Sequence, residues 1–553
     1  MSVSRRLFDL IISGGEIVDG TGAPRYRGDL GITGDVITAI GDLSGMRAGE
    51  VVDAAGRVVC PGFIDMHTHS DLFVLEQPFL APKIRQGITT DLLGQDGIAA
   101  APLPPQYLDT WRRHLAGLDG GPPIAWDWDD VASYLAKVER SGPSYNIAFL
   151  VPHGNIRMQV MGLDGRTATA AERAALQAAL RSALEQGARG MSTGLIYPPC
   201  CYANTEELTA LCEVLAAYGA PFVVHQRSEG DEIIESMGEL IAIARTTGVH
   251  LHFSHLKVCG RKNWSKVDAV LGEIDAARSA GLAITFDQYP YTAGSTMLSA
   301  ILPPWAHAGG TQCLLERLRD PASRARMARE IRSGLQGWDS IAAWAGWDNI
   351  VITSVESEAN APYVGKNLRE IAELRCQSDP LEAAFDLIVE ESNGVGMIDF
   401  VIDEEGICRI IAHPAGTIGS DGLLCGKPHP RAYGTFPRVF ARYVRERGII
   451  SLEEGVRRST SAPAAVLGLS DRGILREGYK ADIVIFDAET IGDTATYADP
   501  RRYPTGISHV LVNGNVVVRG EREIPLPVGA VLRRNYRDTR QTADNHITRE
   551  PVA

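Results

Sequence analysis

The 553-residue chain has no uninterrupted apolar run of 18 residues, the length needed to span a bilayer. Its first apolar stretch is broken by Asp9 and Gly14 and lacks the cleavage site of a secretory signal. An excess of basic residues is also missing, since 54 lysines and arginines against 68 aspartates and glutamates give a net charge of −14. We therefore expect neither a membrane nor a nucleic acid as partner, because no basic surplus is available to neutralise phosphates.

Paired cysteine motifs are lacking as well. The nine cysteines are scattered, odd in number and include no CxxC, which predicts free thiols in a reducing compartment, the cytoplasm. The rest of the composition, 45% hydrophobic and 22% charged, is that of an ordinary globular protein. The length exceeds one ordinary domain and suits a large barrel with a smaller domain beside it.

Short strands separated by glycine-rich turns form both ends of the chain. Residues 1–60 contain five such runs, and residues 476–530 contain two apolar runs joined by Asn513-Gly514, a strong hairpin signal. We expect the two ends to build one small β-sandwich. A polar, extended tail is expected over residues 531–553.

Between the two ends, apolar runs alternate with amphipathic helical stretches, the pattern of repeated βαβ units. Eight such units predict an α/β fold, a (β/α)8 TIM barrel over residues 61–475. The eight strands are expected at about 62–67, 88–94, 146–152, 189–195, 221–226, 250–256, 283–288 and 415–420. The connection at about 296–414 carries its own helices and strands, so we expect an inserted lid over the active-site end.

Two histidines follow the first expected strand. His67 and His69 are two residues apart, so in an extended chain their side chains share one face. Taken on its own, the pair could be two unrelated histidines on a half-buried strand. The strand, however, is apolar on both faces and ends at this point, where barrels place their functional residues. Two imidazoles there can hold a divalent metal.

Metal-ligating residue types also close four other expected strands. They are Asp96, His225, His255 and Asp421, after the second, fifth, sixth and eighth strands. Any one histidine could be an ordinary buried residue, but six such residues at five strand ends are hard to explain by coincidence. They predict a hydrolytic site with one or two metal ions. Of the other histidines, His153 stays ambiguous, His252 is expected to face outward, and His413 is expected to be structural.

Longer motifs resemble a known family. The stretch Gly62-Phe63-Ile64-Asp65-x-His67-x-His69 resembles the first-strand motif of the amidohydrolase superfamily. More specific stretches are similar to those of the N-acyl-D-amino-acid deacylases, or D-aminoacylases, over about residues 8–520. They include Ser192-Thr193-Gly194-Leu195-x-Tyr197, His225-x-Arg227-x-Glu229, Ser254-His255-x-Lys257, Asp287-x-Tyr289-Pro290-Tyr291, Gly419-Ser420-Asp421-Gly422 and His429-Pro430-Arg431.

The resemblance implies a metal-dependent hydrolase of linear amides that converts N-acyl-D-amino acids to a carboxylate and a free D-amino acid. It implies that His225, His255 and Asp96 hold the tighter metal and that His67, His69 and Asp421 face a weaker position. It also implies that Asp421 is the catalytic acid and base. The implied cofactor is zinc, one or two ions. Around the carboxylate of the substrate we expect Tyr197, Lys257, Tyr289, Ser295 and Arg431, with packing or internal pairing as the alternative for each.

One position departs from the family, which typically has a cysteine ligand where this chain has Asp96. A carboxylate is a harder donor than a thiolate, so it should hold zinc less tightly and accept manganese or cobalt more readily. Alternatively, Asp96 does not ligate and caps the turn at Gly97. Two other functions stay open: an amidohydrolase acting on a cyclic or a different linear amide, and a non-catalytic barrel scaffold. The sequence leaves open whether the chain forms a homo-oligomer.

Overall fold

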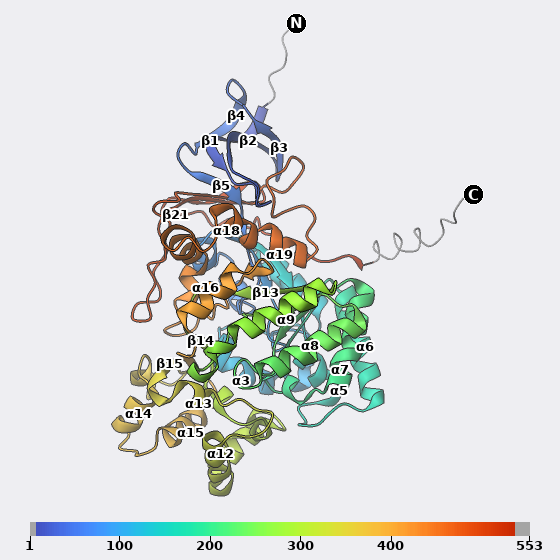
Figure 1. The fold of residues 1–553 in the computed structure, drawn as a ribbon, viewed down its shortest axis with the longest axis vertical. Coiled ribbons are helices and arrows are strands. Elements are labelled where there is room, and N and C mark those ends of the chain that lie inside the picture. Colours follow the sequence, from blue (N-terminus) through green and yellow to red (C-terminus); the bar gives the residue numbers. More distant parts are fainter. Residues whose placement is uncertain (1–6, 537–553) are drawn as a thin grey trace, which may run out of the picture.

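The computed structural model describes residues 7–536 as an assembly of helices and sheets (Figure 1). The predicted association of the two chain ends is present, because one nine-stranded sheet contains strands from both. Its order is β21-β20-β19-β18-β5-β1-β2-β3, with β4 pairing β1. The strands are β1 (Leu7–Ile17), β2 (Tyr26–Thr33), β3 (Val36–Gly41), β4 (Arg47–Asp53), β5 (Val58–Pro61), β18 (Ile483–Phe486), β19 (Ile507–Val512), β20 (Asn515–Arg519) and β21 (Arg522–Glu523).

The join between the two ends is the antiparallel pairing of β5 with β18, in which Val58 lies opposite Phe486 and Pro61 opposite Ile483. All eight residues of these two strands are buried, so the join also belongs to the core. The hairpin predicted at Asn513-Gly514 is confirmed. It connects the antiparallel strands β19 and β20, and both turn residues have positive φ.

Each of the eight predicted central positions holds parallel strands. Two sheets contain them, β6-β7-β8 and β17-β13-β12-β11-β10-β9. Their bounds are β6 (Phe63–Asp65), β7 (Ile88–Leu93), β8 (Asn146–Phe149), β9 (Val151–Pro152), β10 (Met191–Gly194), β11 (Phe222–His225), β12 (Leu251–Phe253), β13 (Ile284–Gln288) and β17 (Gly416–Ile418). They are buried almost throughout, as parallel strands covered on both faces should be.

Helices connect the strands, and their ends follow capping signals in the sequence. The helix α7 begins after Asn204, whose side chain accepts the Glu207 N–H, and ends at Gly219 in the left-handed region. The helices outside the insertion are α1 (Phe73–Glu76), α2 (Ala81–Ile84), α3 (Leu108–Asp119), α4 (Val131–Ser141), α5 (His153–Met161), α6 (Ala170–Glu185), α7 (Thr205–Tyr218), α8 (Ile233–Thr247), α9 (Val267–Ser279), α17 (Arg431–Arg438), α18 (Leu452–Ser459) and α19 (Ser461–Val466), with a π-helix over Val439–Glu446.

Most of the predicted insertion forms a group of elements at one end of the molecule, yellow to olive in Figure 1, whereas its last helix, in orange, lies nearer the central strands. Three antiparallel strands, ordered β14-β16-β15, pack with helices around a separate hydrophobic cluster that includes Leu318, Ile352 and Phe385. The elements are β14 (Gly294–Met297), α10 (Pro304–His307), α11 (Thr311–Arg319), α12 (Pro321–Ser333), α13 (Ile341–Ala345), β15 (Ile350–Ser354), α14 (Leu368–Leu374), α15 (Pro380–Glu390), β16 (Gly396–Asp399) and α16 (Glu404–Ala412). Short 3₁₀ turns occur at Pro105–Tyr107, Cys200–Tyr202, Arg261–Lys266, Leu298–Ile301, Trp347–Asn349 and Ala361–Tyr363.

None of the helices in residues 7–536 combines the length and the apolar composition that crossing a bilayer requires. All nine cysteines are free thiols, as the sequence predicts. The tail is predicted to be extended, and its residues 537–553 lie outside the described part of the chain. Its described beginning follows the central strands: the Leu532 N–H donates to the Ile147 carbonyl, and the Tyr536 hydroxyl donates to the Ala188 carbonyl at 3.0 Å.

Candidate metal centre

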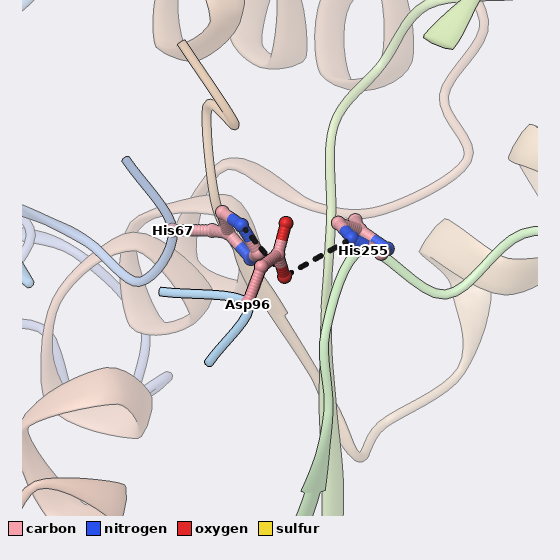
Figure 2. A group of neighbouring side chains, drawn as sticks. All are labelled: His67, Asp96 and His255. Carbon is pink, nitrogen blue, oxygen red and sulfur yellow. Dashed lines mark ion pairs between the residues drawn. The ribbon is translucent and has the colours of Figure 1, made fainter. Parts of the chain in front are cut away.

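The structure brings the six predicted metal-site residues together at one end of the parallel strands. His67 and His69 follow β6, Asp96 follows β7, and His225 is the last residue of β11. His255 lies just beyond β12, and Asp421 follows β17. All six side chains are buried, with at most 6% exposed. Figure 2 shows three of them from separate segments, with the Asp96 carboxylate between His67 and His255.

The carboxylate of Asp96 is the centre of the group. Its Oδ1 lies 3.5 Å from His67 Nε2, 3.7 Å from His255 Nε2 and 3.9 Å from His225 Nδ1. Its Oδ2 lies 3.5 Å from His69 Nε2. The two oxygens therefore face different histidines, which is the arrangement a bridging carboxylate needs. The alternative, that Asp96 only caps the turn at Gly97, does not account for these contacts.

Asp421 lies on the other side of His67 and His69. Its Oδ1 is 3.3 Å from His69 Nε2 and 3.7 Å from His67 Nε2. Its Oδ2 is 2.9 Å from Nη1 of Arg431. Three overlapping groups of three possible donors result, each with all donor atoms within 4.8 Å of one another: His67 with Asp96 and His255, His67 with His69 and Asp421, and His225 with Glu229 and His255.

These separations fit a metal ion. Donors bound tetrahedrally at about 2.1 Å lie about 3.4 Å from one another, close to most of the distances above. Several donor atoms also have no hydrogen-bond partner although they are fully buried: both ring nitrogens of His67, Oδ1 of Asp96 and Nε2 of His225. Leaving buried polar atoms unpaired is costly, so the site is built to receive a ligand.

The electrostatics favour a cation at the same point. Burial would lower the pKa of His69, but hydrogen bonds to Asp421 and Asp96 outweigh it and raise the pKa to about 10. Burial and the Lys257 charge would likewise lower the pKa of His255, yet Glu229 and Asp96 raise it to about 9. Carboxylates thus stabilise positive charge among these donors, which protons supply when no metal does.

Three of these residues have an unusual backbone. Asp96, His255 and Asp421 all have positive φ, of 55°, 35° and 50°. Only seven non-glycine residues of the described chain do so. A left-handed backbone conformation is strained for most residues, and residues that adopt it are concentrated at functional sites. Here it occurs directly after strands β7, β12 and β17, where the chain turns each side chain towards the others.

A cavity opens beside the donors and contains most of the predicted substrate-binding residues. It encloses about 660 Å³ of empty space counted to its mouth, and His69, Asp96, His225, His255 and Asp421 line it together with Tyr197, Lys257, Tyr289 and Ser295. The Tyr289 hydroxyl is buried without a partner, so it is free to donate to a bound molecule. The Tyr197 hydroxyl instead pairs with Thr296, and the Ser295 hydroxyl donates to the Met397 carbonyl.

Arg431 occupies a different place from the expected one. It is fully buried, is absent from the residues that line the cavity, and is held between Asp421 and the carbonyl of Ser295. Its guanidinium lies 4.5 Å from the centre of the Tyr289 ring. Internal pairing, the alternative reading of this arginine, describes these contacts.

Known proteins share this architecture and sequence. A profile of the Amidohydrolase family matches residues 50–518. The N-acyl-D-glutamate deacylase of Alcaligenes xylosoxydans xylosoxydans is 40% identical over 528 residues, which cover 95% of this chain and 97% of that protein. The chain belongs to the amidohydrolase family, in its N-acyl-D-amino-acid deacylase branch. The D-aminoacylase of the same organism is 37% identical over 532 residues, covering 95% and 98%.

A solved structure agrees. N-acyl-D-glutamate deacylase from Bordetella bronchiseptica, complexed with zinc and a phosphonate that mimics the tetrahedral intermediate of the reaction, is similar with a TM-score of 0.82 and 36% identity. The match covers 96% of this chain and all of that one. The resemblance inferred from the sequence motifs is therefore confirmed.

Sequence reasoning about this amidohydrolase missed two carboxylates behind the histidines. Glu229 Oε1 lies 3.1 Å from His255 Nδ1 and 2.6 Å from Lys257 Nζ. Asp287 accepts the His255 N–H at 3.0 Å, and its other oxygen lies 3.9 Å from His67 Nδ1. Such outer carboxylates fix the orientation of metal-binding histidines. Their positions within strand-end motifs were the available signal, but nothing in the sequence distinguished them from other acids there.

A network of buried polar side chains connects two of the segments that carry the donors. Lys83, which has no exposed surface, donates to Asp65 at 2.7 Å and to Ser420 at 2.8 Å. Asp65 also accepts the Ser420 N–H at 2.7 Å. These bonds join the segment that carries His67 to the segment that carries Asp421. Lys83 was not predicted, because its sequence context is that of an ordinary short helix.

The remaining histidines divide as follows. His153 is buried against Thr193 and Glu207, and His413 pairs with Asp275, so both are structural. The prediction that His252 faces outward is wrong, because it contacts Asp287 at 3.0 Å, on the side of the site. Alternation of faces holds only within a strand, and β12 ends at Phe253 before the left-handed His255. His114 and His307 are buried away from the centre, and His546 lies outside the described residues.

Proposed function

We propose that this amidohydrolase removes the acyl group from N-acyl-D-amino acids, with one or two zinc ions bound by the six predicted residues. The observation that carries the proposal is the cluster of six buried imidazole and carboxylate side chains from five strand ends. His67, Asp96 and His225 have atoms without a hydrogen-bond partner, and all of the six except His67 line one cavity. The names of the similar proteins support the substrate class, and the zinc complex of one of them supports the metal. Because the oxygens of Asp96 replace a thiolate, manganese and cobalt are alternative metals.

The arrangement supports two positions. His225, His255 and Asp96 are proposed to hold the tighter ion, and His67, His69 and Asp421 to face the weaker one. Bound there, the metal supplies a Lewis acid for the amide carbonyl and lowers the pKa of water. Glu229 and Asp287 keep His255 and His67 in place. The short contact of 2.8 Å between His225 Nδ1 and His255 Nε2 brings these two donors together before any ion binds.

Asp421 is the proposed acid and base. Its Oδ1 faces His69, and the residue lines the cavity. There it can take a proton from the water and later give it to the leaving amine. Burial would raise the pKa of Asp421, but the Arg431 charge and His67 hold it well below its usual range. Arg431 therefore keeps the carboxylate in the form that accepts a proton.

Lys257 and Tyr289 are the proposed partners of the substrate carboxylate. Lys257 is 7% exposed, lines the cavity and lies 5.7 Å from the centre of the Tyr289 ring. A cation and an unpaired hydroxyl can both donate to one carboxylate. Tyr197 and Ser295 complete this part of the cavity wall, and Arg431 acts behind it through Asp421.

The fold is proposed to be a closed (β/α)8 barrel with a β-sandwich and a lid. Support for closure comes from the two ends of the parallel sheets: β8 and β9 follow one another with one residue between them, and a parallel bridge joins Thr68 to Gly422. The proposed division is residues 1–60 and 476–530 for the sandwich, 61–475 for the barrel, 296–414 for the lid, and 531–553 for the tail. The nine free thiols support a cytoplasmic location. Self-association stays a prediction.

The test is hydrolysis of paired N-acetyl-D- and N-acetyl-L-amino acids by metal-stripped enzyme, with zinc, manganese or cobalt added back. We expect metal-dependent release of the D-amino acid and no comparable turnover of the L series. Hydrolysis confined to cyclic amides such as dihydropyrimidines would replace the proposal with a different amidohydrolase activity. A protein that purifies without metal and binds none would be a scaffold.

A further inference from the structure

Part of the cavity wall is apolar and aromatic. Trp338, Ile341 and Trp344, all from the insertion, line the cavity together with Ile196 and Cys259. Trp344 is fixed there, since its Nε1 donates to Asp231 at 3.2 Å and its ring fits against the backbone of Gly230 and Gly260. A pre-formed apolar wall of this kind favours a substrate with a large apolar side chain, which excludes water.

Apart from the metal site, the charged groups around the cavity are mostly negative. Lys257 is the one lysine or arginine that lines it in the described chain, and Glu229 already neutralises it at 2.6 Å. The acids on the wall are Asp96, Glu229, Asp339, Asp399 and Asp421. The α-carboxylate of an N-acyl amino acid would pair with Lys257, the single lysine. A second carboxylate, on the side chain, would find no cation.

The nearest arginines do not change this balance. Arg431 is bound to Asp421, and Arg227 belongs to a neighbouring cavity, where its Nε lies 3.2 Å from Glu239. Both guanidinium groups therefore have an acidic partner, although Nε and Nη1 of Arg431 make no hydrogen bond. Neither is among the residues that line the substrate cavity.

Asp339 stands next to the aromatic wall. It lines both the substrate cavity and the neighbouring one, which also contains Glu232, Glu235 and Glu239. The Ser228 hydroxyl donates to its carboxylate and accepts the Glu232 N–H, so Asp339 is held in place. An acidic substrate side chain lying against Trp338 would meet this fixed negative charge, with further carboxylates behind it.

Building on the deacylase function proposed above, we propose that this enzyme selects N-acyl amino acids with large neutral apolar or aromatic side chains and rejects glutamate and aspartate side chains, with Asp339 as the residue that rejects them. This differs from what overall similarity suggests, since a protein 40% identical to this chain is named for N-acyl-D-glutamate. Sequence identity is averaged over the whole chain, whereas selectivity depends on the few residues facing the side chain.

The first test uses the wild-type, zinc-loaded enzyme and measures kcat/KM for N-acetyl-D-leucine, -phenylalanine, -glutamine and -glutamate. Glutamine and glutamate have nearly the same shape, so their ratio isolates charge. We expect leucine and phenylalanine to exceed glutamate by about 100-fold and glutamine to exceed it by about tenfold, the range for leaving a charge unpaired in a built site. Glutamate as good as leucine or glutamine would overturn the inference while leaving the deacylase function intact. If none of the four is hydrolysed, the deacylase function itself fails.

The second test concerns Asp339. The isosteric Asp339→Asn should raise the glutamate-to-glutamine ratio by about five- to tenfold with little change for leucine, because it removes one like charge near the side chain. Glu235→Gln is the matched control, since Glu235 is exposed and lines only the neighbouring cavity, and it should leave the ratio within about twofold. Trp338→Lys, which adds a cation on the same wall, should shift the ratio in the same direction as Asp339→Asn. Unchanged ratios in both wall variants would remove Asp339 from substrate selection.

Discussion

The contact between Arg431 and Asp421 makes the sharpest prediction about catalysis. Arg431 Nη1 lies 2.9 Å from Asp421 Oδ2, and neither side chain is more than 8% exposed. Replacing the arginine with methionine, which keeps much of its apolar volume, removes the cation and leaves the carboxylate buried. The pKa of Asp421 should then rise, because burial disfavours the charged form and the opposing charge is gone.

The size of the effect follows from the separation of the charges. Unit charges about 4 Å apart at an effective dielectric near 20 interact by about 4 kcal/mol. That energy corresponds to about three pKa units, an upper bound because the metal and the histidines also stabilise the carboxylate. A carboxylate with a higher pKa becomes protonated at higher pH. Activity of Arg431→Met should therefore be lost from the acidic side, with the acid limb of kcat/KM moved up by about one to three pH units.

The assay is the pH dependence of kcat/KM for an N-acetyl-D-amino acid, with bound metal measured in the same samples. Arg438→Met is the matched control: Arg438 lies on the same helix, stacks on Tyr291 at 4.6 Å and pairs with Asp493 at 3.0 Å, as Arg431 does with Tyr289 and Asp421. The control should keep the wild-type acid limb, and Arg431→Lys should shift it less than methionine does. An unmoved acid limb in a metal-replete Arg431→Met enzyme would refute the reasoning.

Substitutions at four further positions test the site. His255→Ala should lose metal and activity together in elemental analysis and turnover, because one donor of a three-donor group is removed; full metal with full turnover would contradict the assignment. Asp421→Asn should keep the fold and lower kcat by about 10²–10⁴, whereas a fall below about tenfold would mean that another group moves the proton. Lys257→Met should raise KM for N-acyl amino acids more than for matched N-acyl amines, and an equal effect would exclude carboxylate binding. Asp96→Ala should weaken zinc binding by more than about 100-fold, and Asp96→Cys should favour zinc over manganese relative to wild type; three equal sets of dissociation constants would exclude ligation.

Much of the fold was predictable because its signals are local. The parallel strands are apolar runs that end at glycine or polar residues, and β7 and β13 lie within a residue of their expected bounds. The ends of helix α7 follow local signals of the same kind, because Asn204 caps one end and Gly219 takes the left-handed position at the other. The donors were predictable for a similar reason: strand ends in such folds mark function, and histidine and aspartate ligate metals.

What escaped prediction depends on contacts distant in sequence. Trp338 faces the cavity because the insertion packs onto loops after β11 and β12, and no local pattern records that docking. Arg431 matched a family motif, but its pairing with Asp421 depends on how helix α17 returns towards β17. Lys83 bonds to both Asp65 and Ser420, which are 355 residues apart. Sequence alone gave the residue types present at the site and could not say which of them pair with one another.

The backbone explains why aspartate suits position 96. Among non-glycine residues, aspartate, asparagine and histidine tolerate positive φ best, and the three site residues with left-handed backbone are Asp96, His255 and Asp421. The same two residue types are therefore good metal donors and also fit the turn that follows a buried strand. A cysteine at position 96 would keep a donor but would adopt φ of 55° at a cost of order 1 kcal/mol. It would also offer one donor atom where the two oxygens of Asp96 now face different histidines. Under the proposed assignment, the aspartate would give up the softer bond to zinc and would keep both a less strained turn and two oxygens that face different histidines.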